Sequence, residues 1–336
     1  MGMLKPYVSV IVNVFQRRDF VVSAVSSVIN QSTERSLYEI IVVKDFEDDT
    51  IDAFLESQHV KCILEKDPKP SVRLARAIDS SCGEIISFLE DDDLFAKDKI
   101  ETVVAAFRHH PELGFFHDGS GHFEVANISC GEGVLTQLTG VDCDCFIGDS
   151  QSYLALYNKL RLNSSTVYCS MISIARVVST NNRDLFLRVQ SAVDLFFFYN
   201  ALFLGKHVLI TKSPKSYYRF HQSATNWYGS INEFAPKLYK YSSNAVADWK
   251  LLASLAQSAE LKKLVEQESA WHQFMCLIFG DTYSRRHVFI TGVTQAIVAR
   301  KARTILLGTL YLMSPALSQR LYFIWYNMIR ARILDS

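Results

Sequence analysis

The first hundred residues alternate between short apolar runs and segments in which apolar positions recur at helical spacing. The apolar runs are rich in Val and Ile and bounded by polar residues, so they predict buried strands. The segments between them predict amphipathic helices, and Asp19 is placed to cap the first of these. We predict strands at 8–14, 39–43, 60–64 and 85–89, and helices at 20–29, 50–56, 71–80 and 96–109.

Regular alternation of strands with helices predicts right-handed βαβ crossovers. The fold class is therefore α/β, with a Rossmann-like, mostly parallel sheet sandwiched by helices. Ligands of such sheets bind outside the carboxyl ends of the strands. Phe15, Asp45 and the run Glu90–Asp93 each follow a predicted strand. We expect them to meet at one edge of the sheet.

Beyond residue 110 the pattern is less regular. A stretch rich in Gly, Ser and Asn predicts turns and loops, and the very apolar helix that follows is ended by Gly205. From residue 231 onward the pattern predicts mostly helices. The loops are expected at 119–140, the apolar helix at 194–204, and two short strands at 207–210 and 216–220.

Four consecutive acids, Glu90, Asp91, Asp92 and Asp93, follow the fourth predicted strand. Adjacent carboxylates repel one another unless a cation neutralises them, and Mg²⁺ or Mn²⁺ prefers such oxygen ligands. The same cation would bind the phosphates of a nucleotide diphosphate and stabilise it as a leaving group. Alternatively, Asp93 caps the next helix and its neighbours are solvated. The two interpretations are compatible, since Asp93 can cap while Glu90 and Asp92 face a ligand.

Five further residues are candidates, and each has a plainer alternative. Asp45 can accept a hydrogen bond from a base or ribose, or form a turn. Phe15 can stack on a base or pack in the core, and Arg73 can pair with a phosphate or remain solvated. Asp194 can act as a general base or as the partner of a helix dipole. His221 can be a metal ligand or a structural residue.

Composition limits the class of protein. Of the 336 residues, 49% are apolar, which allows a sizeable core and argues against wholesale disorder. The seven cysteines are an odd number and form no C-x-x-C pair, so a reducing, cytoplasmic setting is favoured. The first residues lack a signal-peptide pattern, and no apolar run reaches the ~18 residues that span a bilayer.

Five segments occur in an order and spacing that resemble the inverting family-2 glycosyltransferases of the GT-A fold. The resemblance covers residues 7–226. It implies a GT-A domain over 1–228, with a nucleotide-sugar half (1–110) and an acceptor half (111–228), followed by a helical extension over 229–336. The five segments are VSVIVNVFQRRDF, EIIVVKD, GEIISFLEDDD, VDLFFFYNALFLGK and YYRFHQSATN.

The resemblance implies a role in donor binding for several positions. Phe15 stands where the family usually has a Tyr beside the base, and Asp45 stands where an Asp contacts the base or ribose. Arg73 lies near the arginine that meets the diphosphate. Glu90, Asp91 and Asp92 match the D-x-D motif, with Asp92 as the direct metal ligand. The implied partners are a nucleotide-diphosphate sugar and Mn²⁺ or Mg²⁺.

The resemblance also implies the catalytic residues. Asp194 matches the base that deprotonates the acceptor hydroxyl, and His221 matches the His of the Y-R-x-H motif, which helps to hold metal or diphosphate. The acceptor would be a glycan or a lipid-linked molecule. The sequence departs from the family's pattern in four places, which concern the geometry of donor sugar and acceptor: the segment 13–16, Glu90, Val193 and Asn200.

The formal net charge of zero hides an asymmetry. From Thr282 onward there are eight Lys or Arg residues against one acid, so this segment carries a charge of about +7 and residues 1–281 about −7. Basic clusters mixed with apolar stretches over 285–336 favour amphipathic helices on an anionic membrane surface, at its cytoplasmic face. A helical cap on the acidic body, or an oligomer interface, is the alternative. Nucleic acid is disfavoured because no recognised binding motif accompanies the charge.

Other functions remain as alternatives. A sugar-phosphate nucleotidyltransferase would normally have a glycine-rich loop after the first strand, but residues 15–18 contain no glycine. A dehydrogenase is disfavoured because no G-x-G-x-x-G follows a strand. A catalytically inactive, membrane-docked binding module with the same fold is the alternative from another class.

Overall fold

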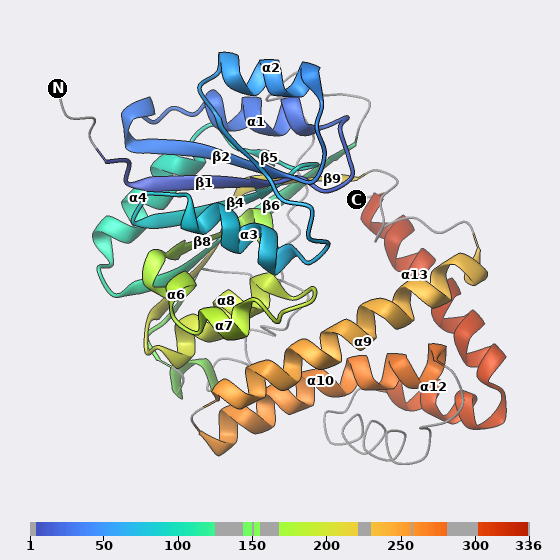
Figure 1. Ribbon diagram of the computed structural model, residues 1–336. Helices are drawn as coiled ribbons and strands as arrows, with labels where there is room; N and C mark the ends of the chain where they lie inside the picture. Colours follow the sequence, from blue (N-terminus) through green and yellow to red (C-terminus); the bar gives the residue numbers. More distant parts are fainter. Residues whose placement is uncertain are drawn as a thin grey trace. The chain divides into compact units, whose positions relative to one another are not determined.

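The computed structural model describes residues 5–124, 144–149, 151–154, 168–220, 230–256, 258–280 and 302–334. The chain divides into two compact units, Met1–His221 and Gln222–Ser336, which are drawn in Figure 1. Each unit is described by itself. The division of the first unit at residue 110, and its end at residue 228, stay predictions.

The first half of the sheet is parallel, as predicted. Its strands lie in the order β3-β2-β1-β4, so the first strand of the sequence is central, and every residue of β1 is buried. Each predicted strand is present to within one or two residues. The bounds are β1 Val8–Asn13, β2 Tyr38–Lys44, β3 Lys61–Leu64 and β4 Ile85–Glu90.

Helices cover both faces of this parallel part (Figure 1). On one face, apolar side chains of α1, α2 and α4 join Val8, Val10 and Val12 in one core cluster. On the other face, the ring of Phe197 stacks on Phe88 of β4 at a centroid distance of 5.2 Å. The helices are α1 Val21–Ile29, α2 Asp49–Ser57, α3 Pro70–Asp79, α4 Lys99–His109 and, carrying Phe197, α8 Val193–Phe203.

The second half of the sheet is mixed, whereas the sequence predicts a mostly parallel sheet. β8 runs antiparallel between β4 and β6, and β5 and β7 both pair antiparallel with β9. β6 and β9 are parallel to each other. The strands are β5 Leu94–Phe95, β6 Leu113–Glu124, β7 Cys145–Ile147, β8 Ile172–Ala175 and β9 His207–Phe220.

Two predictions in this half are wrong. Residues 119–124 belong to β6 rather than to a loop, and the two short strands predicted after Gly205 form the single strand β9. Gly205 ends the apolar helix α8 as predicted, since its φ of 66° is a left-handed conformation. Short helical segments complete the unit: Arg35–Leu37, Cys169–Met171, α6 Arg176–Thr180 and α7 Arg183–Phe186.

Two predicted caps are also wrong. α1 begins after Phe20 without a capping side chain, so Asp19 does not cap it. Asp93 does not cap α4, because that helix begins six residues later, at Lys99. The carboxylate of Asp48 does cap α2, since it accepts hydrogen bonds from the first amides of that helix.

The second unit is helical, as predicted. α9 and α10 pack along each other, and α12 packs on α13. Phe234, Phe274 and Tyr322 lie in the core that joins these helices. Among the described residues, none of the helices combines the length and apolar character needed to cross a bilayer. The helices are α9 Ile231–Leu255, α10 Ala259–Phe279, α12 Ala302–Met313 and α13 Pro315–Leu334.

Candidate functional site

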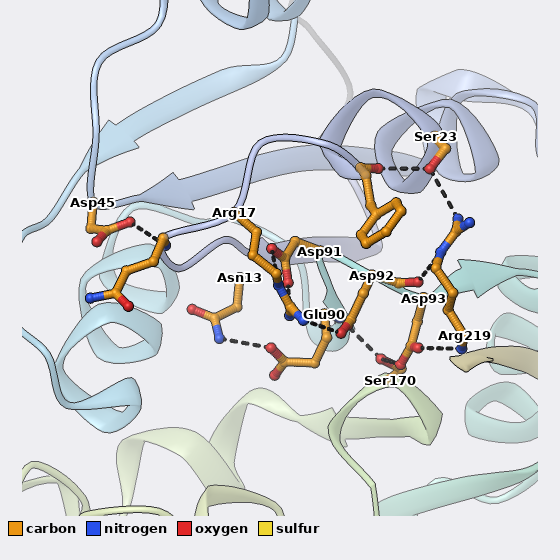
Figure 2. A network of polar contacts seen from close by, with 12 residues as sticks. Asn13, Arg17, Ser23, Asp45, Glu90, Asp91, Asp92, Asp93, Ser170 and Arg219 are labelled. Carbon is orange, nitrogen blue, oxygen red and sulfur yellow. Dashed lines mark hydrogen bonds and ion pairs between the residues drawn. The ribbon is translucent and has the colours of Figure 1, made fainter. Parts of the chain in front are cut away.

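The register of the parallel strands brings the predicted site residues to one edge of the sheet. Asn13, the last residue of β1, lies opposite Val43 of β2 and Glu90 of β4. The three strands therefore end at the same level, and the residues that follow them meet there (Figure 2). This is the carboxyl edge at which α/β sheets bind ligands.

Arg17 spans the acidic run from the loop after β1. Its Nη2 and Nε donate to the two carboxylate oxygens of Asp91 at 2.5 and 3.1 Å. Its Nη1 lies 2.6 Å from Oδ2 of Asp92. Although burial opposes its charge, the hydrogen bond to Asp91 and the charge of Asp92 raise the pKa of Arg17 above its ordinary value. We did not identify Arg17 from the sequence; two arginines in this loop opposite four acids were the available signal.

The neighbouring acids carry raised pKa values because they are buried together. Burial, followed by the charges of Asp91 and Asp92, raises the pKa of Glu90 to about 7. Glu90 accepts a hydrogen bond from Nδ2 of Asn13 at 3.0 Å. Burial also raises the pKa of Asp91 to about 6, although its bond to Arg17 opposes this. Burial of these carboxylates beside one another thus disfavours their ionised forms.

Asp93 is held by the protein itself. Its Oδ2 accepts a hydrogen bond from Oγ of Ser170 at 2.6 Å, and its Oδ1 accepts one from the amide of Arg219 at 3.1 Å. The hydroxyl of Ser170 also accepts a bond from the amide of Glu90. Arg219 donates through Nε to the carbonyl oxygen of Asp92. Ser170 and Arg219 therefore fix the shape of the acidic run, and sequence reasoning gave neither of them a role.

Asp45 faces the loop that contains Arg17. Its Oδ1 accepts a hydrogen bond from the amide of Gln16 at 2.9 Å. Gln16 has a φ of 62°, a left-handed conformation that is uncommon for a residue with a β-carbon. The carboxylate of Asp45 thus stabilises the loop that carries Phe15 and Arg17 to the site.

Arg73 and Phe15 are brought into direct contact. The guanidinium of Arg73 lies 4.2 Å from the centroid of the Phe15 ring, a cation–π geometry. Arg73 is buried, and it donates to Oδ1 of Asn13 and to the carbonyl oxygens of Asp67 and Pro68. Burial lowers its pKa, although the charges of nearby acids oppose this. Arg73 is therefore joined to Glu90 through Asn13.

Asp194 is the second residue of α8, and its Oδ1 accepts a hydrogen bond from the amide of Leu195. Burial, and after it the charges of Glu90 and Asp194, raise the pKa of the Cys169 thiol well above its ordinary value. Asp194 and Glu90 therefore both lie within electrostatic range of Cys169, which precedes Ser170. His221, the other residue predicted from the C-terminal part of the domain, lies outside the described residues.

The acidic run offers the ligand chemistry of a hard cation. Asp91 and Asp92 already direct three carboxylate oxygens at one guanidinium, and oxygen ligands suit Mg²⁺ or Mn²⁺. Among the described residues, no group of three His, Cys, Asp or Glu side chains could hold an ion by itself. A cation at this run would therefore complete its shell with water or with oxygens of a bound ligand, as Mg²⁺ commonly does.

Residues 9–125, from β1 to β6, match the profile of Glycosyl transferase family 2. This segment of the first unit is similar to the family 2 glycosyltransferases. A Rickettsia conorii protein described as an uncharacterized glycosyltransferase is 32% identical over 98 residues, which are 28% of this chain and 16% of that protein. The matching segment thus spans less than two thirds of this relative.

Solved structures show the GT-A fold of the family 2 domain. Staphylococcus aureus TarS in complex with UDP-GlcNAc is 15% identical, with a TM-score of 0.53 over 81% of this chain and 73% of that chain. The mannosyltransferase PcManGT of Pyrobaculum calidifontis, in complex with GDP-Man and Mn²⁺, is 14% identical, with a TM-score of 0.51 over 98% and 86%. The predicted fold class is confirmed.

Proposed function

We propose that this protein transfers a sugar from a nucleotide-diphosphate sugar to an acceptor hydroxyl, with inversion at the anomeric carbon. The observation that carries the proposal is the meeting of Asp45 and the acidic run at the carboxyl edge of the sheet (Figure 2), within the segment that matches family 2 glycosyltransferases. Phe15 adjoins them, since its ring contacts Arg73 and the amide of the next residue, Gln16, donates to Asp45. TarS and PcManGT, which share the fold, bind UDP-GlcNAc and GDP-Man. A nucleotide-diphosphate sugar is the donor class that this likeness supports.

The donor would lie across the ends of β1, β2 and β4. Phe15 offers a ring face to the base, and Asp45 offers a carboxylate to a base N–H or a ribose hydroxyl. Asp91 and Asp92 would hold Mn²⁺ or Mg²⁺, with His221 as a further ligand. The cation would neutralise the diphosphate as it departs. Arg73 contacts the ring of Phe15 and donates to Asn13, so it would position both residues. This role would be additional to its predicted contact with the diphosphate.

Asp194 is the proposed general base. Its carboxylate would take the proton of the acceptor hydroxyl as that oxygen bonds to the anomeric carbon. The bond from the anomeric carbon to the diphosphate oxygen breaks in the same displacement, and its electron pair leaves with the nucleoside diphosphate. Attack from the opposite face inverts the configuration.

Turnover of nucleotide sugars tests the proposal. Purified protein is incubated with UDP-, GDP- and dTDP-sugars and Mn²⁺ or Mg²⁺, and release of nucleoside diphosphate is measured. We expect release with at least one donor and its loss in EDTA. Binding of a nucleotide sugar without any release, with or without candidate acceptors, would instead favour an inactive binding module.

Asp194→Asn tests the base. The variant should lose transfer by about 10²-fold or more while its affinity for the donor nucleotide is nearly unchanged. Asp184→Asn is a matched control, since Asp184 is also an acid in the first turn of a short helix. The control should retain activity. Equal loss of nucleotide affinity and turnover in Asp194→Asn would contradict the assignment.

We propose further that the second unit docks on an anionic membrane, at its cytoplasmic face, where a lipid-linked acceptor would be presented. Leu317, Leu321, Ile324 and Met328 of α13 are 38–53% exposed. Their spacing of four, three and four residues puts them on one face of that helix. Residues 302–334 contain four arginines and no acid, which suits anionic lipid and would make a second copy repel.

Sedimentation with vesicles tests the docking. The full chain should bind vesicles containing an anionic lipid and bind zwitterionic vesicles weakly. Ile324→Glu combined with Met328→Glu should abolish binding, whereas Leu64→Glu should not, because Leu64 is an exposed apolar residue of the first unit. Equal sedimentation of the two variants would refute the membrane surface. A dimer that dissociates in the double variant would assign the face to a second copy instead.

A further inference from the structure

Two carboxylates of the acidic run are paired with a positively charged side chain of the protein, that of Arg17. Three nitrogens of Arg17 contact Oδ1 and Oδ2 of Asp91 and Oδ2 of Asp92. The side chain of Asp91 is 1% exposed, whereas that of Arg17 is 32% exposed. Arg17 is thus the more exposed partner of this ion pair, and its contacts with the two carboxylates are drawn in Figure 2.

A divalent cation would need the same oxygen atoms. Sharing these oxygens between a guanidinium and Mn²⁺ or Mg²⁺ is unfavourable, since two cations on one ligand set repel each other. Arg17 and the divalent cation therefore compete for one pair of carboxylates. Binding of the metal would favour a movement of Arg17 away from them.

The surroundings of Arg17 favour such a movement. Arg17 lies in the loop between β1 and α1, outside regular secondary structure. Its guanidinium is at the end of a long, flexible side chain. Arg73 and Arg219, two guanidiniums at this edge, are buried and bonded to backbone carbonyl oxygens. The bonds of Arg17 named above go instead to the carboxylates that a cation would take. Arg17 is therefore the arginine whose contacts a bound metal would weaken most.

We propose that Arg17 is exchanged between the acidic run and the donor. Without ligand it neutralises Asp91 and Asp92, and when the divalent cation enters it pairs with the diphosphate. A guanidinium suits both partners, because its planar fork binds carboxylate and phosphate in the same bidentate way. The inference rests on the proposed donor class and adds to it a binding residue that competes with the metal for the acidic run.

Direct binding of Mn²⁺ to the full chain tests the exchange, measured by calorimetry without a donor. Arg17→Gln should bind Mn²⁺ about tenfold more tightly than the natural protein, the scale of a lost charged hydrogen bond. With saturating Mn²⁺, the same variant should bind UDP or GDP about tenfold more weakly. Opposite changes in the two affinities are the signature of a residue that moves from one partner to the other.

Arg18→Gln is the matched control. It removes the same charge from the adjacent position, but Arg18 is paired with Asp48 at 3.2 Å and lies over the ring of Phe46. We expect less than about a twofold change in either affinity, since exposed ion pairs contribute little. Arg17→Lys, which keeps the charge without the fork, should fall between Arg17→Gln and the natural protein. Circular dichroism before each titration confirms that the variants are folded.

An unchanged or weaker affinity of Arg17→Gln for Mn²⁺ would overturn the exchange, because it would mean that Arg17 supports the carboxylates in both states. Equal changes in Arg17→Gln and Arg18→Gln would overturn it too, since they would reduce the effect to net charge. Neither readout depends on turnover. If the protein transfers sugar but Arg17→Gln leaves the Mn²⁺ affinity unaltered, the exchange is wrong and the proposed function stands. If the affinities change as expected but no transfer is found, the exchange stands and the proposed function is wrong.

Discussion

The guanidinium of Arg73 lies 4.2 Å from the centroid of the Phe15 ring. Through its bond to Oδ1 of Asn13, the same guanidinium is linked to Glu90, because Nδ2 of Asn13 donates to that carboxylate. The Phe15 ring is thus connected to the acidic run through two buried side chains, those of Arg73 and Asn13. The loop after β1 and the run after β4 should respond together when Phe15 is changed.

Phe15→Ala should weaken the binding of UDP or GDP by about tenfold, the scale of one lost aromatic or cation–π contact. The variant lacks the ring that would stack on the base, and it also lacks the ring that contacts the guanidinium of Arg73. Phe15→Tyr keeps both and should bind within about twofold of the natural protein. Calorimetric titration in Mn²⁺ measures the affinities, and the same loss in both variants would mean that the ring does not face the base.

Ser170→Ala should destabilise the protein by about 1–3 kcal/mol, because it removes the hydroxyl that donates to Oδ2 of the buried Asp93 and accepts from the amide of Glu90. Ser57→Ala is the control: its exposed hydroxyl donates only to a carbonyl of its own helix, and the change should stay within about 0.5 kcal/mol. Urea unfolding followed by circular dichroism gives both values. If the two variants unfold alike, Ser170 does not hold the run.

The parallel half of the fold was predictable because its strands are buried on both faces and its helices are amphipathic. The other half was not, because the glycine at 119 opens a stretch whose composition predicts turns and loops. A β-carbon at Gly119 would lie 2.2 Å from the carbonyl oxygen of Lys212. Glycine there allows β6 to approach β9 closely, a tertiary reason that no sequence window contains. Pro214 likewise lies inside β9 and divided that strand in the prediction.

The site was predictable as far as it depends on the ends of strands. Phe15, Asp45 and Glu90–Asp92 could be found because the carboxyl ends of parallel strands meet. Arg17, Ser170 and Arg219 could not, since their partners are reached by loops and side chains far apart in sequence. Asp93 shows the limit most clearly, because its place before a helix predicted a cap and its carboxylate instead binds Ser170 and Arg219.

Gln16→Gly should stabilise the protein by about 0.5–1 kcal/mol, because the φ of 62° at Gln16 is strained for a residue with a β-carbon. The amide bond to Asp45 is kept in this variant. Gln58→Gly makes the same chemical change where φ is −96° and should be neutral or destabilising. Thermal unfolding of the two variants measures the difference, and destabilisation by Gln16→Gly would show that the left-handed conformation there is not strained.

The second unit should lose stability in mild acid because of His272. Burial lowers the pKa of His272 from 6.5 to about 4, and its Nδ1 makes no hydrogen bond with the described residues. The unfolded chain therefore takes up a proton near pH 6.5 that the folded unit does not bind. The contribution of His272 to the free energy of unfolding is therefore constant above that pH and falls as the pH is lowered. The loss should reach about 3 kcal/mol at pH 4.

His272→Phe should remove this dependence, since it keeps an aromatic ring near Tyr241 without a titrating group. All four tryptophans lie in the second unit, at 227, 249, 271 and 325, so their fluorescence reports its unfolding selectively. Urea unfolding at pH 7.5 and at pH 5 gives the free energy of unfolding of both proteins. The natural protein should lose about 2 kcal/mol more than the variant between these two pH values. Equal losses would mean that His272 is protonated in the folded unit, with an acidic partner to hold the charge.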